Sequence, residues 1–431
     1  MGGWVTSLRP SYNYQANNNL EMESKEFTID IEKILEASFE AAPECCIYRV
    51  PRDLRKINKK AYTPQVVSIG PLHHCKQEYL IEMEKQKLIY VKKFGERTSI
   101  DKLKEMKSFI KVNERKIRIC YAENPSLSSD EFITMILYDA VFIIELFLRN
   151  DEMRTEFDIL LGTPILKAAI KLDLQLLENQ LPYFVFKDLF FKLGDVAKPS
   201  GEENYDDPFL ILASRFFFDS ELGHLKYKYT FDLQHFTDLR RCFLLNKDIV
   251  NPTNNIVKER LRDLPCATKL DGSGVKFECI EDRSSLEISC EYKTKSPQLI
   301  PFIKVQELEL QIPRFDVYDG TECLIRNVMA LEQLHYPFET HVCNYMILLD
   351  FLIDTETDVD LLVKKGIILN CLGDSAAIAN MFNKLGLQVT PSYSERYFGQ
   401  FGVAEKLKAH YGKSWNHSKA TFQGYISEIL G

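Results

Sequence analysis

The sequence has no uninterrupted apolar run of the roughly 18 residues that a membrane-spanning helix needs. The nearest approach, Phe132 to Leu148, is shorter and carries two carboxylates, so we interpret it as a buried core helix. The amino terminus lacks the apolar segment of a secretory signal. With 45% hydrophobic and 27% charged residues, the 431-residue chain has the composition of a soluble globular protein.

An excess of basic charge is also missing. The formal net charge is -8, which argues against nucleic acid as a main partner. One basic run, between Arg49 and Lys60, is typical of a solvated surface. No Cys-x-x-Cys pair occurs, and the cysteine count of 11 is odd. We therefore expect reduced thiols in a cytosolic environment.

The known catalytic signatures are absent as well. The sequence has no G-x-S-x-G elbow, phosphate-binding loop, dinucleotide-binding glycine set or kinase signature. It also lacks H-x-x-x-H and H-E-x-x-H, the spacings that place two histidines on one metal ion. We expect no cofactor and no metal.

Hydrophobic periodicity predicts an irregular multi-helix domain that is mainly α, with a small antiparallel β insertion (an α+β fold). Two pairs of residues, Ser128 with Glu131 and Asp319 with Glu322, have the spacing of a capping box at the start of a helix. Asp374 is predicted to cap the start of the 374–386 helix. Residues 45–80 are interrupted by Pro51, Pro64, Gly70 and Pro71 and are expected to be extended and turn-rich. The predicted helices are Phe27–Ala42, Tyr79–Phe94, Ile100–Cys120, Phe132–Leu148, Ile170–Leu189, Phe209–Asn246 (with Phe216, Phe217 and Phe218 half-buried), 319–335, Val342–Ile353, 374–386 and Tyr397–Tyr411.

Near Pro265 the sequence pattern changes from helical periodicity to β-rich stretches. Three β-rich stretches follow, at 275–279, 286–292 and 308–312, and residues 271–274 (DGSG) are interpreted as a hairpin turn. We predict a flexible arm over 1–25, a domain over 26–422 and a short tail over 423–431. The domain is divided into a helical lobe (about 26–262) and a sheet-plus-helix lobe (about 263–422). Residues 198–208 and 251–255 are predicted surface loops.

The stretch Ile170–Leu189 stands out because polar residues interrupt its apolar face. Asp173, Glu178, Asn179 and Gln180 lie among leucines at helical spacing, and Pro182 is expected to end or kink the helix. Buried polar groups must find partners, because leaving them unpaired is costly. We expect this helix to pack against the Phe132–Leu148 helix at the centre of the fold.

These two helices and one turn supply the candidate catalytic residues, which are Asp139, Glu145, Asp173, Glu178, His73 and His74. One hypothesis makes them metal ligands or an acid/base set around one pocket. The other makes the acids a buried network, paired with Arg or Lys, that fixes helix register. We favour the second, because Asp139 and Glu145 are about 120° apart on a helix and need not face one point. For His73 and His74 we favour stabilisation of the turn.

Several stretches together carry a family resemblance. They are YRVP at 48–51, VVSIGPLHH at 66–74, EMEKQKLIYVKKF at 82–94, MILYDAVFIIELF at 135–147, DLQLLENQLPYFV at 173–185, LPCATKLDGSGVKF at 264–277, DGTECLIRNVMALEQ at 319–333, DFLIDTETDVDLLVKKGII at 350–368, LGDSAAIANMFNKLG at 372–386 and HYGKSWNHSKATF at 410–422. In this order they resemble the plant family known as domain of unknown function 247, which consists of uncharacterised plant membrane proteins. The resemblance covers roughly residues 28–422.

The resemblance implies a C-terminal membrane span after Phe422, where this chain continues QGYISEILG. We interpret the chain as a truncated form, either a natural one or the product of a gene model that lost the span. The lysines before this point would keep the family's domain cytoplasmic, so we expect this chain to be cytoplasmic or peripheral. The family implies a non-enzymatic recognition or signalling protein that binds another protein, in reproductive processes such as self-incompatibility or sex determination. The alternative is an enzyme of an unrecognised class with an acidic/His pocket between the two central helices.

Overall fold

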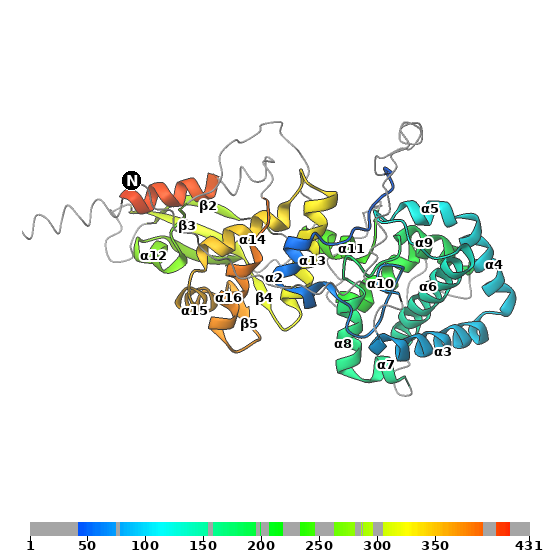
Figure 1. Ribbon diagram of the computed structural model, residues 1–431. Helices are drawn as coiled ribbons and strands as arrows, with labels where there is room; N and C mark the ends of the chain where they lie inside the picture. Colours follow the sequence, from blue (N-terminus) through cyan, green and yellow to red (C-terminus); the bar gives the residue numbers. More distant parts are fainter. Residues whose placement is uncertain are drawn as a thin grey trace, which may run out of the picture. The chain divides into compact units, whose positions relative to one another are not determined.

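The computed structural model describes residues 42–74, 78–153, 158–194, 199, 207–218, 233–245, 263–280, 286, 288–295, 305–390 and 402–413 (Figure 1). The predicted arm over 1–25, nearly all of the predicted helix Phe27–Ala42, most of the 198–208 loop, the 251–255 linker and the 423–431 tail lie outside these residues. From Ala42 onward the chain belongs to one compact unit. The division into two lobes near residue 263 stays a prediction.

Helices dominate the first half of the chain, and the predicted class, mainly α with a small β part, is confirmed. These helices are α2 (Arg52–Ile57), η1 (Lys59–Tyr62), η2 (Glu78–Leu80), α3 (Ile81–Arg97), α4 (Ile100–Val112), α5 (Glu114–Ile119), α6 (Ser129–Asp151), α7 (Ile159–Gly162), α8 (Pro164–Asp173), α9 (Tyr183–Phe191), α10 (Pro208–Phe218) and α11 (Phe236–Leu245). The short helices α2 and η1 lie in a region predicted to be extended. The predicted helix Ile100–Cys120 is two helices, because Asn113 leaves helical geometry and bonds back to Phe109 O.

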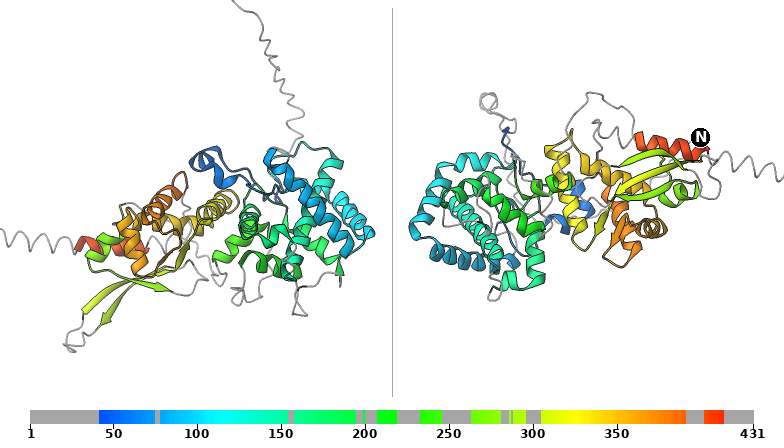
Figure 2. Two further views of the ribbon diagram at one scale, coloured as in Figure 1. Left: turned by 90° about the horizontal axis from the view of Figure 1, so that it is seen from below. Right: turned by 180° about the vertical axis from the view of Figure 1, so that it is seen from behind.

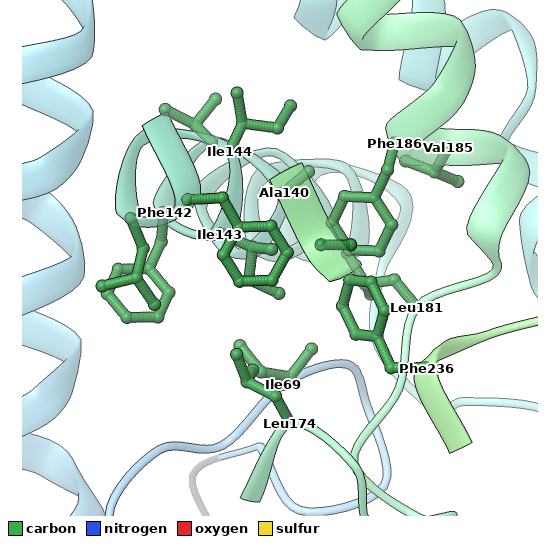
Figure 3. Packing of buried hydrophobic residues seen from close by; sticks show 14 of the residues in the cluster. Ile69, Ala140, Phe142, Ile143, Ile144, Leu174, Leu181, Val185, Phe186 and Phe236 are labelled. Atoms are coloured by element: carbon green, nitrogen blue, oxygen red, sulfur yellow. The ribbon is translucent and has the colours of Figure 1, made fainter. Parts of the chain in front are cut away.

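The helix α6 is the centre of this half. The predicted capping box is present, since Ser128 accepts from Glu131 N and the Glu131 carboxylate accepts from Ser128 N. The helix is apolar around its whole circumference, so it must be covered on all sides. It packs against α3, α4, α9 and α10, and Figure 3 shows Ile143 of α6 and Phe186 of α9 in the same buried hydrophobic cluster.

The predicted helix Ile170–Leu189 is wrong as a single helix. α8 ends at Asp173, residues 174–182 form turns, and α9 starts after Pro182. The polar side chains cause the break: the Gln180 amide donates to Leu174 O and Leu176 O, and the Asn179 amide donates to Asp173 O. Polar side chains that bond nearby backbone groups in this way compete with helix formation. The expected packing against α6 is still present, through Leu174, Leu181 and α9.

An aromatic cluster fills the core beside α6. Phe147 stacks on Phe216 at a ring-centroid distance of 4.6 Å, and Phe186 stacks on Phe209 at 5.1 Å. The prediction that Phe216, Phe217 and Phe218 are half-buried is wrong, because all three are buried. Successive helical residues point in different directions, so α10 must be enclosed by its neighbours rather than lie on the surface.

The second half combines two small sheets with helices. Its elements are α12 (Ala267–Gly272), β1 (Lys276–Ile280), β2 (Ser289–Lys295), β3 (Val305–Pro313), β4 (Phe315–Val317), α13 (Thr321–His335), α14 (His341–Leu352), α15 (Glu356–Lys364), β5 (Ile368–Asn370), α16 (Ser375–Leu385) and a helix over 402–413. Asp374 caps α16 as predicted, accepting from Ala376 N and Ala377 N. The predicted cap at Asp319 is wrong: α13 starts after Gly320 without a side-chain cap, and Glu322 binds Asn58 and Arg326 instead.

The larger sheet is mixed rather than wholly antiparallel. Its order is β1-β3-β2, with β3 parallel to β1 and antiparallel to β2; Figure 2 shows β2 and β3 side by side in yellow-green. The predicted hairpin at 271–274 is instead the end of α12, where Gly274 has φ +92°. Because residues 271–274 end a helix, β1 has no hairpin partner before it and pairs with β3 instead. A turn signal in the sequence indicates pairing between strands adjacent to the turn, so it could not indicate this pairing.

Candidate functional site

Three candidate residues meet at one segment, Gln65–His73, which we call the anchored turn. The carboxylate of Asp173, at the end of α8, accepts from the backbone N–H groups of Gln65, Val66 and Val67 at 2.9, 2.6 and 2.8 Å. Asp139, in the middle of α6, accepts from Gly70 N at 2.8 Å. Backbone donors outside regular secondary structure need partners when buried, and here buried acids supply them.

Asn179 and Gly70 complete the turn. Asn179 accepts from Ile69 N and donates to Val67 O, so both ends of its amide hold the turn. Gly70 has φ +70°, and a Cβ at this position would lie 2.5 Å from Gln180 O. Only glycine fits such a left-handed, crowded position without strain. The local sequence V-S-I-G-P therefore fixes how closely the turn approaches the segment before α9.

Asp139 is paired with a buried lysine. Lys87 of α3 is fully buried, and its Nζ lies 2.6 Å from Asp139 Oδ1 and 2.7 Å from Glu84 Oε1. Lys87 also donates to the carbonyl of Ser68 in the anchored turn. Burial lowers the pKa of Lys87, but the two carboxylates outweigh burial and raise it. Lys87 is thus a permanent cation that holds α3, α6 and the turn together.

Glu178 lies at the far end of the turn. It accepts from Val50 N at 2.7 Å, contacts the guanidinium groups of Arg49 and Arg55, and lies 3.1 Å from His73 Nε2. Burial raises the pKa of Glu178, but the close contacts with His73 and Arg55 outweigh burial and lower the pKa. Glu178 is therefore held ionised. Arg49 and Arg55 are bound to it rather than being simply solvated, which corrects part of our interpretation of the basic run.

The remaining candidates lie apart from these contacts. Glu145, also on α6, binds Arg97 Nε at 2.8 Å, and Arg97 in turn binds Glu152. His74 is half-buried and takes part in none of the contacts described above. The structure thus brings together Asp139, Asp173, Glu178 and His73, and separates Glu145.

The sequence analysis did not identify the basic residues that pair with the buried acids, although the sequence contained a signal for one of them, Lys87. Lys87 falls in the apolar stripe of α3 with Met83, Tyr90 and Phe94. A lysine in an apolar stripe predicts a buried charge that needs a carboxylate. Glu332 of α13 gives the same signal among buried apolar residues, and its partner is Arg241, at an Nε–Oε1 distance of 3.1 Å.

The acids that hold the anchored turn all bind backbone groups or cations of the chain. Each acid of the anchored turn already accepts hydrogen bonds from the chain, and each is buried. A general base must be free to take a proton from a substrate, and these acids are engaged. Among the described residues, no group of three or more His, Cys, Asp or Glu side chains is arranged to hold a metal ion.

The pH dependence of stability tests the state of Asp173. Burial raises its pKa to about 6, although three backbone N–H groups lower it. Because the folded state then binds the proton more tightly than the unfolded state, the contribution of Asp173 to stability increases as pH falls from 6 to 4. We expect the difference in free energy of unfolding between wild type and Asp173→Asn to grow by about 2 kcal/mol between pH 7 and pH 4. Urea denaturation at both pH values measures it, and a shrinking difference contradicts the direction.

None of the described helices has both the length and the hydropathy that crossing a membrane demands. No solved structure matches the chain. Two proteins of Arabidopsis thaliana match the chain in sequence. The UPF0481 protein At3g47200 is 28% identical over 389 residues, covering 86% of this chain and 79% of that protein. The putative UPF0481 protein At3g02645 is 28% identical over 185 residues, covering 42% of this chain and 34% of that protein. The profile of the plant family DUF247, described as plant protein of unknown function, matches residues 47–429, and the chain therefore belongs to that family.

Proposed function

We propose that this protein is a non-enzymatic recognition or signalling module that binds an acidic segment of another protein through α4 and α5. The surface concerned consists of Lys104, Lys107, Lys111 and Arg115, which we call the basic face. The three lysines follow helical spacing on the exposed side of α4, and Arg115 is exposed on α5. The helical spacing of the three lysines places them on one side of α4, and Arg115 adds a fourth exposed cation on the next helix.

The charge of this surface is the observation that carries the proposal. Residues 100–119 contain seven Lys or Arg and three Asp or Glu, whereas the whole chain has a net charge of -8. Lys104 pairs with Asp101 at 2.9 Å, but no described acid forms an ion pair with the other three cations of the basic face. A local positive field on an acidic chain favours an acidic partner segment.

Two exposed apolar side chains stand at the ends of helices α4 and α9. Val112, at the end of α4, is 84% exposed, and Phe191, at the end of α9, is 85% exposed. α4 and α9 pack together: Lys102 donates to Lys192 O, and Lys192 Nζ lies 5.5 Å from the Phe109 ring centroid. Apolar anchors surrounded by charges are typical of protein-binding sites. The expected partner segment is acidic and carries at least one apolar side chain.

The biological setting is part of the proposal and comes from the family resemblance. We expect recognition in plant reproductive development, with the module in the cytoplasm or peripheral at a membrane. Fractionation of plant reproductive tissue, followed with an antibody against this chain, checks the location. Recovery only from a secreted fraction contradicts it.

The enzyme alternative has one contact in its favour, the 3.1 Å approach of His73 Nε2 to Glu178. A His–carboxylate pair can act in general acid–base catalysis. Two guanidinium groups on the same carboxylate oppose this role, because they hold Glu178 ionised and occupied. Turnover of a substrate by the purified chain, lost in a folded Glu178→Gln variant, would establish the alternative.

Charge reversal tests the binding proposal. We expect the double variant Lys107→Glu/Lys111→Glu to retain partners from an extract of reproductive tissue about tenfold less than wild type, because attraction becomes repulsion. Quantitative mass spectrometry of proteins held by each immobilised chain measures the difference. The proteins lost should carry acidic segments.

The matched control is Lys85→Glu/Lys92→Glu, which makes the same change in net charge on the exposed side of α3. It should retain the partners, and circular dichroism should show both variants folded. Equal loss in both double variants, or no loss in either, contradicts a role for the basic face.

A further inference from the structure

Two cysteines far apart in sequence lie side by side next to α5. Ile47 and Tyr121 form an isolated parallel bridge. Cys120 O accepts from both Cys46 N and Ile47 N, at 3.0 and 2.9 Å, and Ile47 O accepts from Ala122 N at 2.9 Å. Cys46 and Cys120 each precede a bridged residue, so they are lateral neighbours whose side chains leave on the same side.

This placement fits a disulfide. Parallel neighbours have Cα atoms about 5 Å apart, within the roughly 4.4–6.8 Å range of disulfide-linked residues. The Cys120 thiol donates to Lys116 O at 3.2 Å. A bond between their sulfur atoms therefore needs only side-chain rotation and no movement of the backbone.

The pair has unequal reactivity. The neighbouring Cys46 thiol and the charge of Lys116 lower the pKa of Cys120, although burial raises it. The neighbouring Cys120 thiol and burial raise the pKa of Cys46. The thiolate is the nucleophile in thiol chemistry, so Cys120 is the attacking sulfur and Cys46 the resolving thiol.

We propose that Cys46 and Cys120 form a reversible intrachain disulfide with a peroxide as oxidant, and that this bond locks residues 42–50 onto the end of α5. The Cys120 thiolate attacks a peroxide oxygen to give a sulfenic acid and, after proton transfer, water. Cys46 then attacks the sulfenic sulfur, which releases a second water as the S–S bond forms. Two thiols and hydrogen peroxide thus become a disulfide and two waters, and a dithiol reverses the reaction.

Access for the oxidant comes from local opening. Both cysteines are buried, so the oxidant reaches them when their segment separates locally from Cys120 and Ala122. This separation breaks the three backbone hydrogen bonds described above. Such short contacts open without global unfolding. The segment continues into Arg49 and Val50, which bind Glu178. The disulfide therefore restrains residues that bind Glu178 at one end of the anchored turn.

The test uses the purified full chain, treated with hydrogen peroxide and digested without reduction. Because Cys45 adjoins Cys46, the digestion is done on a Cys45→Ser background, where a peptide joining Cys46 to Cys120 is expected. The bond closes a loop of about 75 residues, so the thermal midpoint should rise by about 5 °C on oxidation and fall back with dithiothreitol. Cys120→Ser should abolish both the joined peptide and the shift.

Exposed Cys371 is the internal control for the oxidant dose. Failure to find the joined peptide at a dose that oxidises Cys371 overturns the proposal. So does a thermal shift of the same size in Cys46→Ser, because the stabilisation would then come from another thiol.

Discussion

Replacing Lys87 with methionine is expected to lower the free energy of unfolding by about 3–5 kcal/mol. Methionine fills a similar volume, so the loss is electrostatic. Lys87 of α3 forms a buried ion pair with Asp139 of α6 at 2.6 Å. Without the lysine, the Asp139 carboxylate stays buried and loses this cation. Burial already raises the pKa of Asp139, and a carboxylate isolated in this way must take up a proton or unfold its surroundings. Urea denaturation followed by circular dichroism at pH 7 measures the change.

Two further variants separate the buried charge from other effects. Lys85→Met, on the exposed side of the same helix, should change stability by less than about 0.5 kcal/mol. The double variant Lys87→Met/Asp139→Asn removes the unpaired charge but keeps an acceptor for Gly70 N, and it should recover a large part of the loss. If Lys87→Met is as mild as Lys85→Met, the ion pair does not hold the helices together.

Arg241→Met is expected to cost a similar amount, about 3–5 kcal/mol, for the same physical reason. Arg241 of α11 is the buried partner of Glu332, whose carboxylate also accepts from Val342 N and Cys343 N at the start of α14. The guanidinium lies 3.9 Å from the ring centroid of Tyr336 and donates to Glu339 O. Its loss leaves a fully buried anion and weakens the contacts among α11, α13 and α14.

The matched control is Arg115→Met, the same change at an exposed position of α5, where about 0.5 kcal/mol or less is expected. Arg241→Lys should fall between the two, because an ammonium keeps the charge but loses the planar contact with Tyr336. Chemical denaturation of the three variants gives the order, and equal stability of Arg241→Met and Arg115→Met contradicts it.

The sequence was informative where local signals decide structure. The capping box at Ser128 and the long apolar run predict α6 well, because both signals lie within the helix. It was misleading at Ile170–Leu189, where apolar spacing indicates one helix but the Asn179 and Gln180 side chains bond the backbone instead. Periodicity counts side chains by polarity and cannot indicate which backbone group a side chain binds.

The candidate site follows the same division. The position of the acids within apolar helical patterns indicated that they need partners, and the structure supplies those partners. Their identities depend on contacts far apart in the sequence: Lys87 with Asp139, or Arg55 with Glu178. No short motif connects such positions, so the pairing is a property of the fold. Family membership extends over most of the chain, but it assigns no reaction or partner.

The anchored turn has a consequence for engineering the protein. Loops outside regular secondary structure usually tolerate inserted tags, linkers and permuted termini. Here Asp173, Asn179 and Asp139 bind successive backbone amides of one such loop. One added residue would shift every later amide out of register with its acceptor. This loop therefore has a fixed length, and fusion points belong elsewhere in the chain.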